Sequence, residues 1–248
     1  MPASKEIRVL TTPQDVFGAA AEEISHLAAT AVAERGRFTI ALSGGSTPKS
    51  LYQLLAANAR NLLPWDQMFF FFGDERHVPP TDPDSNFRMA DEAMLSKIPV
   101  KPANIFRFMA ENPDAGAVAD DYEETLHKFF KPESTTVPRF DLILLGMGPD
   151  GHTASLFPAT KGLEESRRWV IANWVEKLKT HRLSLTFPVL NAARCVTFLV
   201  CGADKAEMIH NVLEGDPSKE SYPAMTVHPS DGKLIWMLDR AAASALTK

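Results

Sequence analysis

The sequence predicts one α/β domain over residues 1–248, built on a mostly parallel sheet with helices on both faces. Strand-like and helix-like segments alternate along the chain, and no repeat, low-complexity tract or Gly/Ser-rich linker divides it. The strand-like segments, such as Phe38–Leu42 and Phe140–Leu145, are almost continuously apolar. Strands of this kind are buried on both faces, which is typical of parallel sheets. The order of the strands stays open at this level.

The first part of the chain has clear signals for where its elements start and stop. A strand at Ile7–Leu10 precedes a helix that Thr12 caps, that has Pro13 at its first position, and that ends at Gly36. The next expected elements are the strand Phe38–Leu42, the helix Pro48–Ala57, the strand Met68–Phe72, a polar loop through residue 84 and a helix over residues 85–96.

The alternation continues to the end of the chain. A helix opens at residues 112–114 and presents Val118, Tyr122 and Leu126 on one apolar face. The remaining expected elements are a helix over residues 204–213 and strands over residues 104–108, 140–145, 169–175, 182–187, 196–200 and 234–238.

Composition narrows the class of protein. The chain is 45% hydrophobic and 23% charged, the balance of a globular protein with a sizeable core. Its net charge of −5 argues against a general nucleic-acid binder, so no nucleic-acid partner is expected. The apolar run Met68–Phe72 is too short to span a bilayer, and residues 1–8 lack a signal-peptide core, so we expect a cytoplasmic protein without a membrane partner. Cys195 and Cys201 flank a strand and are expected to be buried thiols.

A turn rich in glycine and hydroxyl groups joins the strand Phe38–Leu42 to the helix that follows it. The turn consists of Ser43, Gly44, Gly45, Ser46 and Thr47. Glycines let the backbone approach a ligand closely, and a helix N-terminus favours negative charge. The turn therefore predicts a site for phosphate or another anion, and simple hydroxyl capping of the helix remains the alternative. It matches neither the nucleoside-triphosphate loop nor the dinucleotide fingerprint.

A second polar segment, Gly73–Pro80, directly follows the next strand. Arg76 would bind an anionic substrate through two hydrogen bonds, and Asp74 is a candidate catalytic carboxylate that would orient a hydroxyl or another side chain. A cluster of surface ion pairs is the alternative. Residues 84–86 fit a helix cap as well as they fit a ligand contact.

His152 is the strongest candidate for proton transfer. It lies in a glycine-rich turn just after the strand Phe140–Leu145, and Asp150 precedes it by two residues. Ligands of open α/β sheets bind beyond the carboxyl ends of the strands, and an imidazole accepts a proton near neutral pH. Asp150 is expected to hold the imidazole neutral and directed into a cleft. His77 and His181 are rivals, because each lies near a polar cluster.

Two further cations complete a plausible anion site. Arg182 opens a strand, and Lys205 lies where a strand gives way to a helix. Each alone would equally be a solvated charge, but both lie at the edge of the same expected sheet. No spacing of His, Cys, Asp or Glu resembles a zinc or calcium site, so no metal is expected in the mechanism.

Taken in order, these motifs closely resemble those of the 6-phosphogluconolactonase family. The matching blocks are residues 42–48, 73–79 with 84–86, 146–158, 182–188 with 190–194, and 202–206. They cover nearly the whole chain, from about residue 10 to residue 240. Two positions depart from the family pattern. Ala159 stands where the family often has glycine, and His77 occupies a variable place.

The resemblance implies a Rossmann-like fold, shared with glucosamine-6-phosphate deaminase and ribose-5-phosphate isomerase. It also implies hydrolysis of 6-phospho-D-glucono-1,5-lactone to 6-phosphogluconate without a cofactor. By position, His152 is then the general base and Asp150 its neighbour in the motif. The implied substrate and phosphate contacts are Ser43–Thr47, Arg76, Arg182 and Lys205. The expected partner is a small phosphorylated sugar lactone, and the protein is expected to be a monomer or a weak homodimer.

Two other functions stay open at this level. A deaminase of amino-sugar phosphates would share the fold, but Arg76 and Ser155–Phe157 stand where that enzyme would have different motifs. A non-catalytic sugar-phosphate sensor would need the phosphate contacts but not the histidine loop.

Overall fold

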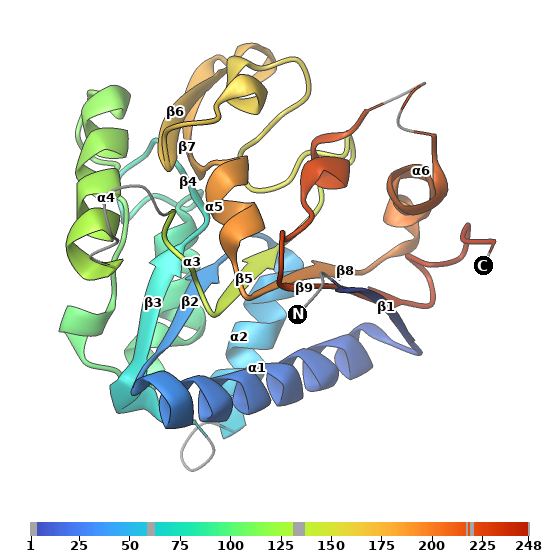
Figure 1. Ribbon diagram of the computed structural model, residues 1–248, viewed down its shortest axis with the longest axis horizontal. Helices are drawn as coiled ribbons and strands as arrows, with labels where there is room; N and C mark the ends of the chain where they lie inside the picture. Colours follow the sequence, from blue (N-terminus) through green and yellow to red (C-terminus); the bar gives the residue numbers. More distant parts are fainter. Residues whose placement is uncertain (1–3, 59–62, 131–136, 217, 219–220, 248) are drawn as a thin grey trace.

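The computed structural model describes residues 4–58, 63–130, 137–216, 218 and 221–247, and these form two sheets with flanking helices (Figure 1). The strands are β1 (Ser4–Leu10), β2 (Phe38–Leu42), β3 (Met68–Phe72), β4 (Asp74–Arg76), β5 (Leu142–Leu145), β6 (Val170–Val175), β7 (Thr180–Leu185), β8 (Cys195–Val200) and β9 (Lys233–Asp239). The α-helices are α1 (Pro13–Arg35), α2 (Ser46–Asn58), α3 (Asn86–Ala93), α4 (Ala115–Phe130), α5 (Phe187–Ala192) and α6 (Ala206–Glu214). Short 3-10 turns connect several of them.

The large sheet has the strand order β1-β9-β8-β5-β2-β3, and all its pairs are parallel. Its central strands β2, β5 and β8 are buried along their whole length, as their continuous apolar runs predict. Because the strands are parallel, the segments that follow β2, β3, β5 and β8 all emerge at one edge. This edge positions the candidate site.

Helices cover both faces of the large sheet, which confirms the predicted α/β architecture. Alternate side chains of β3 show this directly. Phe72 packs on Phe87 of α3, whereas Phe71 packs on Phe129 of α4 from the opposite face. In Figure 1, α1 and α2 lie below the sheet and α4 lies beside β3.

Helix α1 begins and ends where the sequence predicts. The Thr12 hydroxyl accepts a hydrogen bond from the backbone N–H of Asp15, and the Asp15 carboxylate accepts one from the Thr12 N–H, a reciprocal capping box. Gly36 ends the helix with a φ of 72°, a left-handed conformation that favours glycine. A 23-residue helix thus spans the lower face of the sheet.

A second, small sheet was not expected from the sequence. Its order is β4-β7-β6, both pairs are antiparallel, and it lies above the carboxyl edge of the large sheet in Figure 1. Strand β4 is only three residues long and lies in the segment predicted as a polar loop. A three-residue charged strand has no alternation of apolar and polar residues that the sequence could reveal. Only its pairing with β7, about 100 residues later in the chain, defines it as a strand.

Other boundaries also differ from the expectation. The strand predicted at residues 104–108 is wrong, because Pro102–Asn104 forms a 3-10 turn and only Ile105 makes an isolated bridge to Phe70. The strand predicted over residues 182–187 ends at Leu185, and α5 begins at Phe187. Helix α2 begins at Ser46, two residues before the predicted start. Among the described residues, no helix has both the length and the apolar character needed to cross a membrane.

Candidate active site

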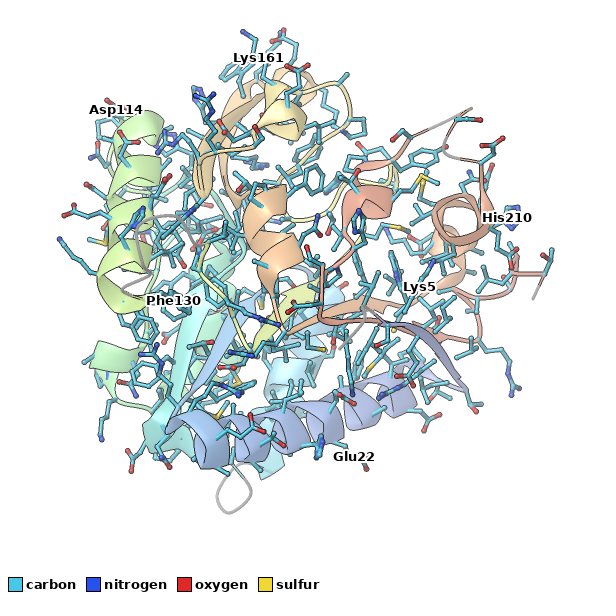
Figure 2. The ribbon with its side chains drawn as sticks, in the orientation of Figure 1. Lys5, Glu22, Asp114, Phe130, Lys161 and His210 are labelled. Carbon is cyan, nitrogen blue, oxygen red and sulfur yellow. The ribbon has the colours of Figure 1, made fainter. Side chains whose placement is uncertain are left out.

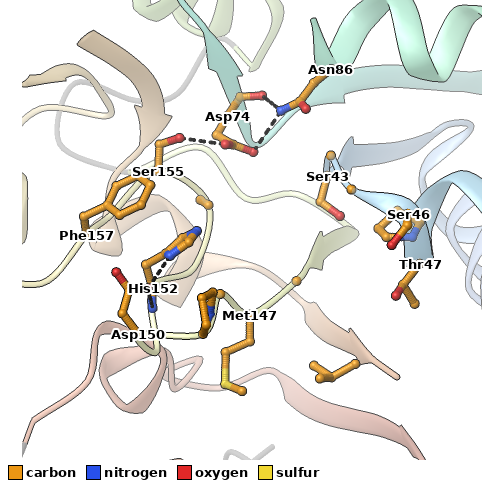
Figure 3. A pocket seen from close by; sticks show the side chains of 18 of the residues that line it. Ser43, Ser46, Thr47, Asp74, Asn86, Met147, Asp150, His152, Ser155 and Phe157 are labelled. Carbon is orange, nitrogen blue, oxygen red and sulfur yellow. Dashed lines mark hydrogen bonds and ion pairs between the residues drawn. The ribbon is translucent and has the colours of Figure 1, made fainter. Parts of the chain in front are cut away.

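A cavity of about 450 Å³ opens at the carboxyl edge of the large sheet, beneath the small sheet (Figure 3). The turns after β2, β5 and β8 supply most of its wall, and β4 and β7 close one side. All of the residues expected to be catalytic or to bind substrate lie along this wall: Ser43, Gly44, Gly45, Ser46, Thr47, Asp74, Arg76, Asp150, His152, Arg182 and Lys205. Parallel strands place the turns that follow them at the same edge of the sheet, and this is sufficient to bring these turns together.

The turn after β2 is held from below by a buried tyrosine. The Tyr52 hydroxyl donates to the Ser43 carbonyl at 2.9 Å and accepts from the Ser43 N–H at 3.0 Å. The Ser43 hydroxyl itself is buried and has no hydrogen-bond partner within the described part of the chain. Gly45 has a φ of 105°, so a side chain there would strain the backbone. The turn thus presents a donor and the N-terminus of α2 to the cavity.

Gly44 lies against the side chain of Asn86, so the turn after β2 touches the start of α3. A Cβ atom at Gly44 would lie only 1.9 Å from Asn86 Oδ1. Ser85 caps α3 by accepting the N–H of Arg88 at 3.1 Å, as the sequence allowed. Asn86 also lines the cavity, so the cap and the ligand-contact interpretations of this segment are compatible.

Two arginines face the cavity from the small sheet. Arg76 on β4 and Arg182 on β7 are directly opposite in the antiparallel register. Within the described residues, neither forms an ion pair with a carboxylate, and the Arg76 guanidinium donates to the Asp84 carbonyl. Burial and the nearby charge of Arg76 lower the pKa of Arg182. Two like charges held side by side favour the arrival of an anion.

Lys205 approaches from the turn after β8. It ends a 3-10 turn just before α6, and its side chain is 22% exposed. Its Nζ lies 3.5 Å from Asp204 Oδ2, and Asp204 is largely solvent-exposed, so this ion pair is weak. The ammonium group is therefore available to a ligand in the cavity.

His152 is fixed by a carboxylate on one side and by an aromatic ring on its face. Its Nδ1 lies 2.5 Å from Asp150 Oδ1, and its ring stacks on Phe157 with centroids 4.0 Å apart (Figure 3). Gly148 leaves room for the imidazole, since a Cβ atom there would lie 2.0 Å from His152 Cε1. Gly148 thus serves the packing of the histidine.

The charge state of Asp150 decides which nitrogen of His152 carries the proton. Partial burial of the Asp150 carboxyl opposes its ionisation, but hydrogen bonds from Lys177 and His152 outweigh burial and lower its pKa to about 2. An ionised carboxylate only accepts hydrogen bonds. Nδ1 of His152 therefore carries the hydrogen in the neutral ring, and Nε2 keeps its lone pair.

Lys177 was not identified from the sequence. Its Nζ forms an ion pair with Asp150 Oδ2 and lies 4.8 Å from the centre of the Phe157 ring. It comes from the turn between β6 and β7, 27 residues after Asp150. A lone lysine in a short turn carries no sequence signal of a role, because the contact exists only when the small sheet folds over the large one.

A network around Asp74 forms the inner wall of the cavity. Asp74 is 8% exposed, and its Oδ2 accepts a hydrogen bond from the Ser155 hydroxyl at 2.7 Å. Asn86 Nδ2 donates to the Asp74 carbonyl at 3.0 Å and to its Oδ1 at 3.3 Å (Figure 3). Asp74 therefore orients a hydroxyl and a side-chain amide that both line the cavity.

The rival histidines lie outside this cavity. The Nε2 of His77 contacts the Asn112 carbonyl at 2.7 Å, and the ring of His181 packs on Trp174. Cys201 lines the cavity and is only half-buried, unlike Cys195. Within the described residues, no group of three or more His, Cys, Asp or Glu side chains is placed to hold a metal ion.

Comparison with known proteins agrees with these features. Residues 11–236 match the family described as glucosamine-6-phosphate isomerases/6-phosphogluconolactonase. The chain is 45% identical over 216 residues to a 6-phosphogluconolactonase of Synechocystis, covering 87% of this chain and 88% of that one. The structure of 6-phosphogluconolactonase from Trypanosoma cruzi is 30% identical, with a TM-score of 0.88 over 100% of this chain and 99% of that one. A monomeric glucosamine-6-phosphate deaminase, 22% identical with a TM-score of 0.79 over 97% of this chain and 99% of that one, has the same fold. The chain therefore belongs to the glucosamine-6-phosphate isomerase/6-phosphogluconolactonase family.

Proposed function

We propose that this protein hydrolyses 6-phospho-D-glucono-1,5-lactone to 6-phospho-D-gluconate, the lactonase step of the oxidative pentose phosphate pathway. One observation carries the proposal: a single cavity brings a histidine–aspartate pair together with a hydroxyl-rich helix N-terminus and several cations. A phosphorylated lactone needs a base at one end and an anion site at the other. The 45% identity to a Synechocystis 6-phosphogluconolactonase supports this substrate.

The phosphate end of the substrate binds where positive charge and donors converge. We assign the phosphate to the turn Ser43–Thr47, together with Arg182 and Lys205. The unpartnered Ser43 hydroxyl and the N-terminus of α2 support this assignment. The guanidinium of Arg182, which lines the cavity and forms no ion pair among the described residues, supports it as well. Held in this way, the phosphate acts as a remote handle that places the lactone ring near His152.

His152 acts as the general base. Its Nε2 takes a proton from water while the water oxygen attacks the lactone carbonyl carbon. The bond from that carbon to the ring oxygen then breaks, and the imidazolium returns the proton to the departing oxygen. Ring opening leaves a carboxylic acid, which ionises, and His152 is neutral again. Asp150 stabilises the imidazolium between the two proton transfers and keeps the hydrogen of the neutral ring on Nδ1.

The carbonyl oxygen gains negative charge in the transition state and needs hydrogen-bond donors. Arg76 and the backbone N–H groups of the glycine-rich turns are the proposed donors, since both line the cavity. Asp74 acts by orienting Ser155 and Asn86 at the inner wall. A lactone is an activated ester, so the proposed steps need water and these side chains, without a covalent enzyme intermediate, a cofactor or a metal.

A coupled assay tests the activity. Freshly made lactone is mixed with the protein, and 6-phosphogluconate is followed through its dehydrogenase against the spontaneous hydrolysis. The protein should accelerate the reaction, and His152→Gln should reduce kcat at least a hundredfold. His77→Gln is a matched control outside the cavity and should keep near wild-type activity. Tight binding of 6-phosphogluconate without faster hydrolysis would instead indicate a sensor, and ammonia release from glucosamine 6-phosphate would indicate a deaminase.

We further propose that the protein acts on this small substrate as a monomer or a weak homodimer in the cytoplasm. All the residues assigned to catalysis and substrate binding line one cavity of a single chain, which supports activity without a partner subunit. Sedimentation at assay concentration, combined with the specific activity, tests the point. Activity that falls in proportion to dissociation of an oligomer would contradict it.

A further inference from the structure

A second cavity, of about 620 Å³, lies at the opposite edge of the large sheet. Its charged residues lie in the segments that lead into the strands: Arg37 directly before β2, Arg194 directly before β8, and Arg139 and Asp231 shortly before β5 and β9. Arg35, from the last turn of α1, completes the set. We call it the arginine cavity, lined by Arg35, Arg37, Arg139 and Arg194. Parallel pairing brings these residues together at the amino ends of adjacent strands, away from the proposed lactonase site.

Positive charge exceeds negative charge in the arginine cavity. Among the described residues that line it, four guanidinium groups stand against two carboxylates, those of Asp141 and Asp231. The whole chain, by contrast, has a net charge of −5. Arg139 Nη2 pairs with Asp231 Oδ1 at 2.8 Å, and Arg35 pairs with the exposed Glu34 as well as with Asp141, so the cluster is partly compensated but keeps an excess of positive charge. Such an excess in an acidic protein attracts small anions to this place.

The nearby carboxylates are already engaged. Asp141 Oδ2 accepts hydrogen bonds from the backbone N–H and the hydroxyl of Thr39, each at 2.8 Å. Its Oδ1 is shared between Arg35 Nη2 at 3.0 Å and Arg194 Nε at 3.4 Å. This carboxylate therefore cannot neutralise both guanidiniums.

Two arginine nitrogens in the cavity are buried without a hydrogen bond. They are Arg139 Nε and Arg194 Nε, and neither has a partner within the described residues. The contact of Arg194 Nε with Asp141 is within ion-pair distance but does not meet hydrogen-bond geometry. Burial, followed by the charges of Arg35 and Arg139, lowers the pKa of Arg194. Buried donors of this kind are normally satisfied, so their state points to a missing acceptor.

One wall of the arginine cavity is apolar. It is formed by Phe130, Val137, Pro138 and Ala192. Phe130, labelled at the end of α4 in Figure 2, packs on Phe140 with ring centroids 4.8 Å apart. An anion that fills this cavity would thus meet guanidiniums on one side and carbon atoms on the other.

We propose that the arginine cavity is a second anion site, which binds a phosphate monoester dianion. The phosphate oxygens accept hydrogen bonds from Arg139 and Arg194 and lie near Arg35 and Arg37, since guanidinium groups match phosphate in charge and geometry. The ester group packs on the apolar wall. This site is independent of the proposed lactonase function, because it shares no residue with the first cavity.

Arginine side-chain resonances provide a direct test. Uniformly ¹⁵N-labelled protein is titrated with inorganic phosphate and with phenyl phosphate at pH 7.5, at an ionic strength held constant with sodium chloride. The Nε–H signals of Arg139 and Arg194 should shift along saturable curves with both probes. Phenyl phosphate should reach half-saturation at a concentration at least threefold lower, because its ring adds contact with the apolar wall. The Nε–H of Arg182 reports any separate binding in the first cavity.

A double variant removes two guanidiniums without leaving Asp141 unpaired, and Asp231, which loses its partner Arg139, is exposed enough to be hydrated. In Arg37→Gln/Arg139→Gln, Arg35 and Arg194 still contact Asp141. The affinity read from the Arg194 signal should fall at least tenfold, and Arg37→Gln alone should lower it about threefold. Lactone hydrolysis and the circular dichroism spectrum should stay as in the wild type, which shows that the fold is intact.

The control pair is Arg167→Gln/Arg240→Gln, which removes two exposed arginines that do not line this cavity and should leave the affinity unchanged. A shift that chloride reproduces, a titration that never saturates, or equal affinity in the double variant would overturn the site. Equal affinity for the two probes would overturn the assignment of the apolar wall.

Discussion

Replacing Asp150 with asparagine tests how the proposed base is held. Asp150 uses its two oxygens differently: Oδ1 faces Nδ1 of His152 at 2.5 Å, and Oδ2 pairs with the Lys177 ammonium. Asparagine has only one acceptor oxygen. Because the Lys177 ammonium can only donate, the amide oxygen will face Lys177, and the NH₂ group will face His152. The imidazole then accepts at Nδ1 and carries its hydrogen on Nε2, where it cannot take a proton from water.

The expected fall in kcat of Asp150→Asn follows from the loss of general-base catalysis by His152. General-base catalysis contributes roughly 10² to 10⁴ in rate, and the wrong tautomer removes most of it. The ion pair that stabilises the imidazolium disappears as well, although both side chains are about one quarter exposed, which moderates the loss. We expect kcat to fall about a hundredfold in Asp150→Asn. KM should change less than threefold, since this pair lies apart from the assigned phosphate contacts.

The assay is the coupled one, with freshly generated lactone and subtraction of the spontaneous rate. Lys177→Met is the milder comparison variant. It removes the ion pair at Asp150 Oδ2 but keeps the hydrogen bond between Asp150 Oδ1 and His152, so kcat should fall no more than about tenfold. A kcat of Asp150→Asn within threefold of wild type would refute the reasoning. So would a loss in Lys177→Met as large as that in Asp150→Asn.

The pH dependence of stability gives an independent reading of the same carboxylate. Its pKa is lowered from 3.8 to about 2 in the folded protein, so its ionisation favours folding above about pH 4. That contribution is lost as the pH falls from about 4 through about 2. The difference in unfolding free energy between wild type and Asp150→Asn should therefore shrink across this window, as measured by urea unfolding. A difference that is constant from pH 5 to pH 2 would show that the carboxylate is not stabilised in the folded state.

The remaining predictions concern binding, packing and stability. Arg182→Ala and Lys205→Ala should each raise KM about tenfold and keep kcat within threefold of wild type, because a charge-assisted hydrogen bond to the phosphate contributes roughly 1.5–3 kcal/mol. Steady-state kinetics would measure both constants, and an unchanged KM in both variants would contradict the phosphate assignment. Gly148→Ala should reduce kcat at least about tenfold in the same assay, since the added carbon would lie 2.0 Å from the His152 ring and must displace it. Glu75→Gln should lower the unfolding free energy by about 2–4 kcal/mol in urea titrations, because both carboxylate oxygens accept hydrogen bonds and an amide NH₂ would face donors.

Matched variants keep these results interpretable. Gly18→Ala lies inside α1 with nothing within 4 Å of the added carbon, so it should leave kcat unchanged and stabilise the protein by about 0.5–1 kcal/mol. Glu92→Gln removes an exposed ion pair on α3 and should leave the stability nearly unchanged. If Glu75→Gln were no more destabilising than Glu92→Gln, the buried carboxylate would not organise the start of α3.

The local patterns of the chain were sufficient for the class of fold and for the edge of the sheet where the site lies. Continuous apolar runs such as Phe38–Leu42 can only be buried on both faces, and parallel strands then deliver their following turns to one edge. Thr12 and Gly36 mark the ends of α1 because capping depends on a few adjacent residues. The glycine-rich turns and the Asp150–His152 pair were visible for the same reason.

Contacts between distant segments were decided only by the tertiary structure. Strand β4 has no period of its own and exists because β7 pairs with it. Lys177 reaches Asp150, and Ser155 reaches Asp74, through the packing of the small sheet on the large one. Arg37, Arg139 and Arg194 precede three different strands and gather only through the strand order β8-β5-β2, which no local pattern encodes. Local sequence determines what each segment can form, whereas the burial of many segments against one another selects which side chains meet.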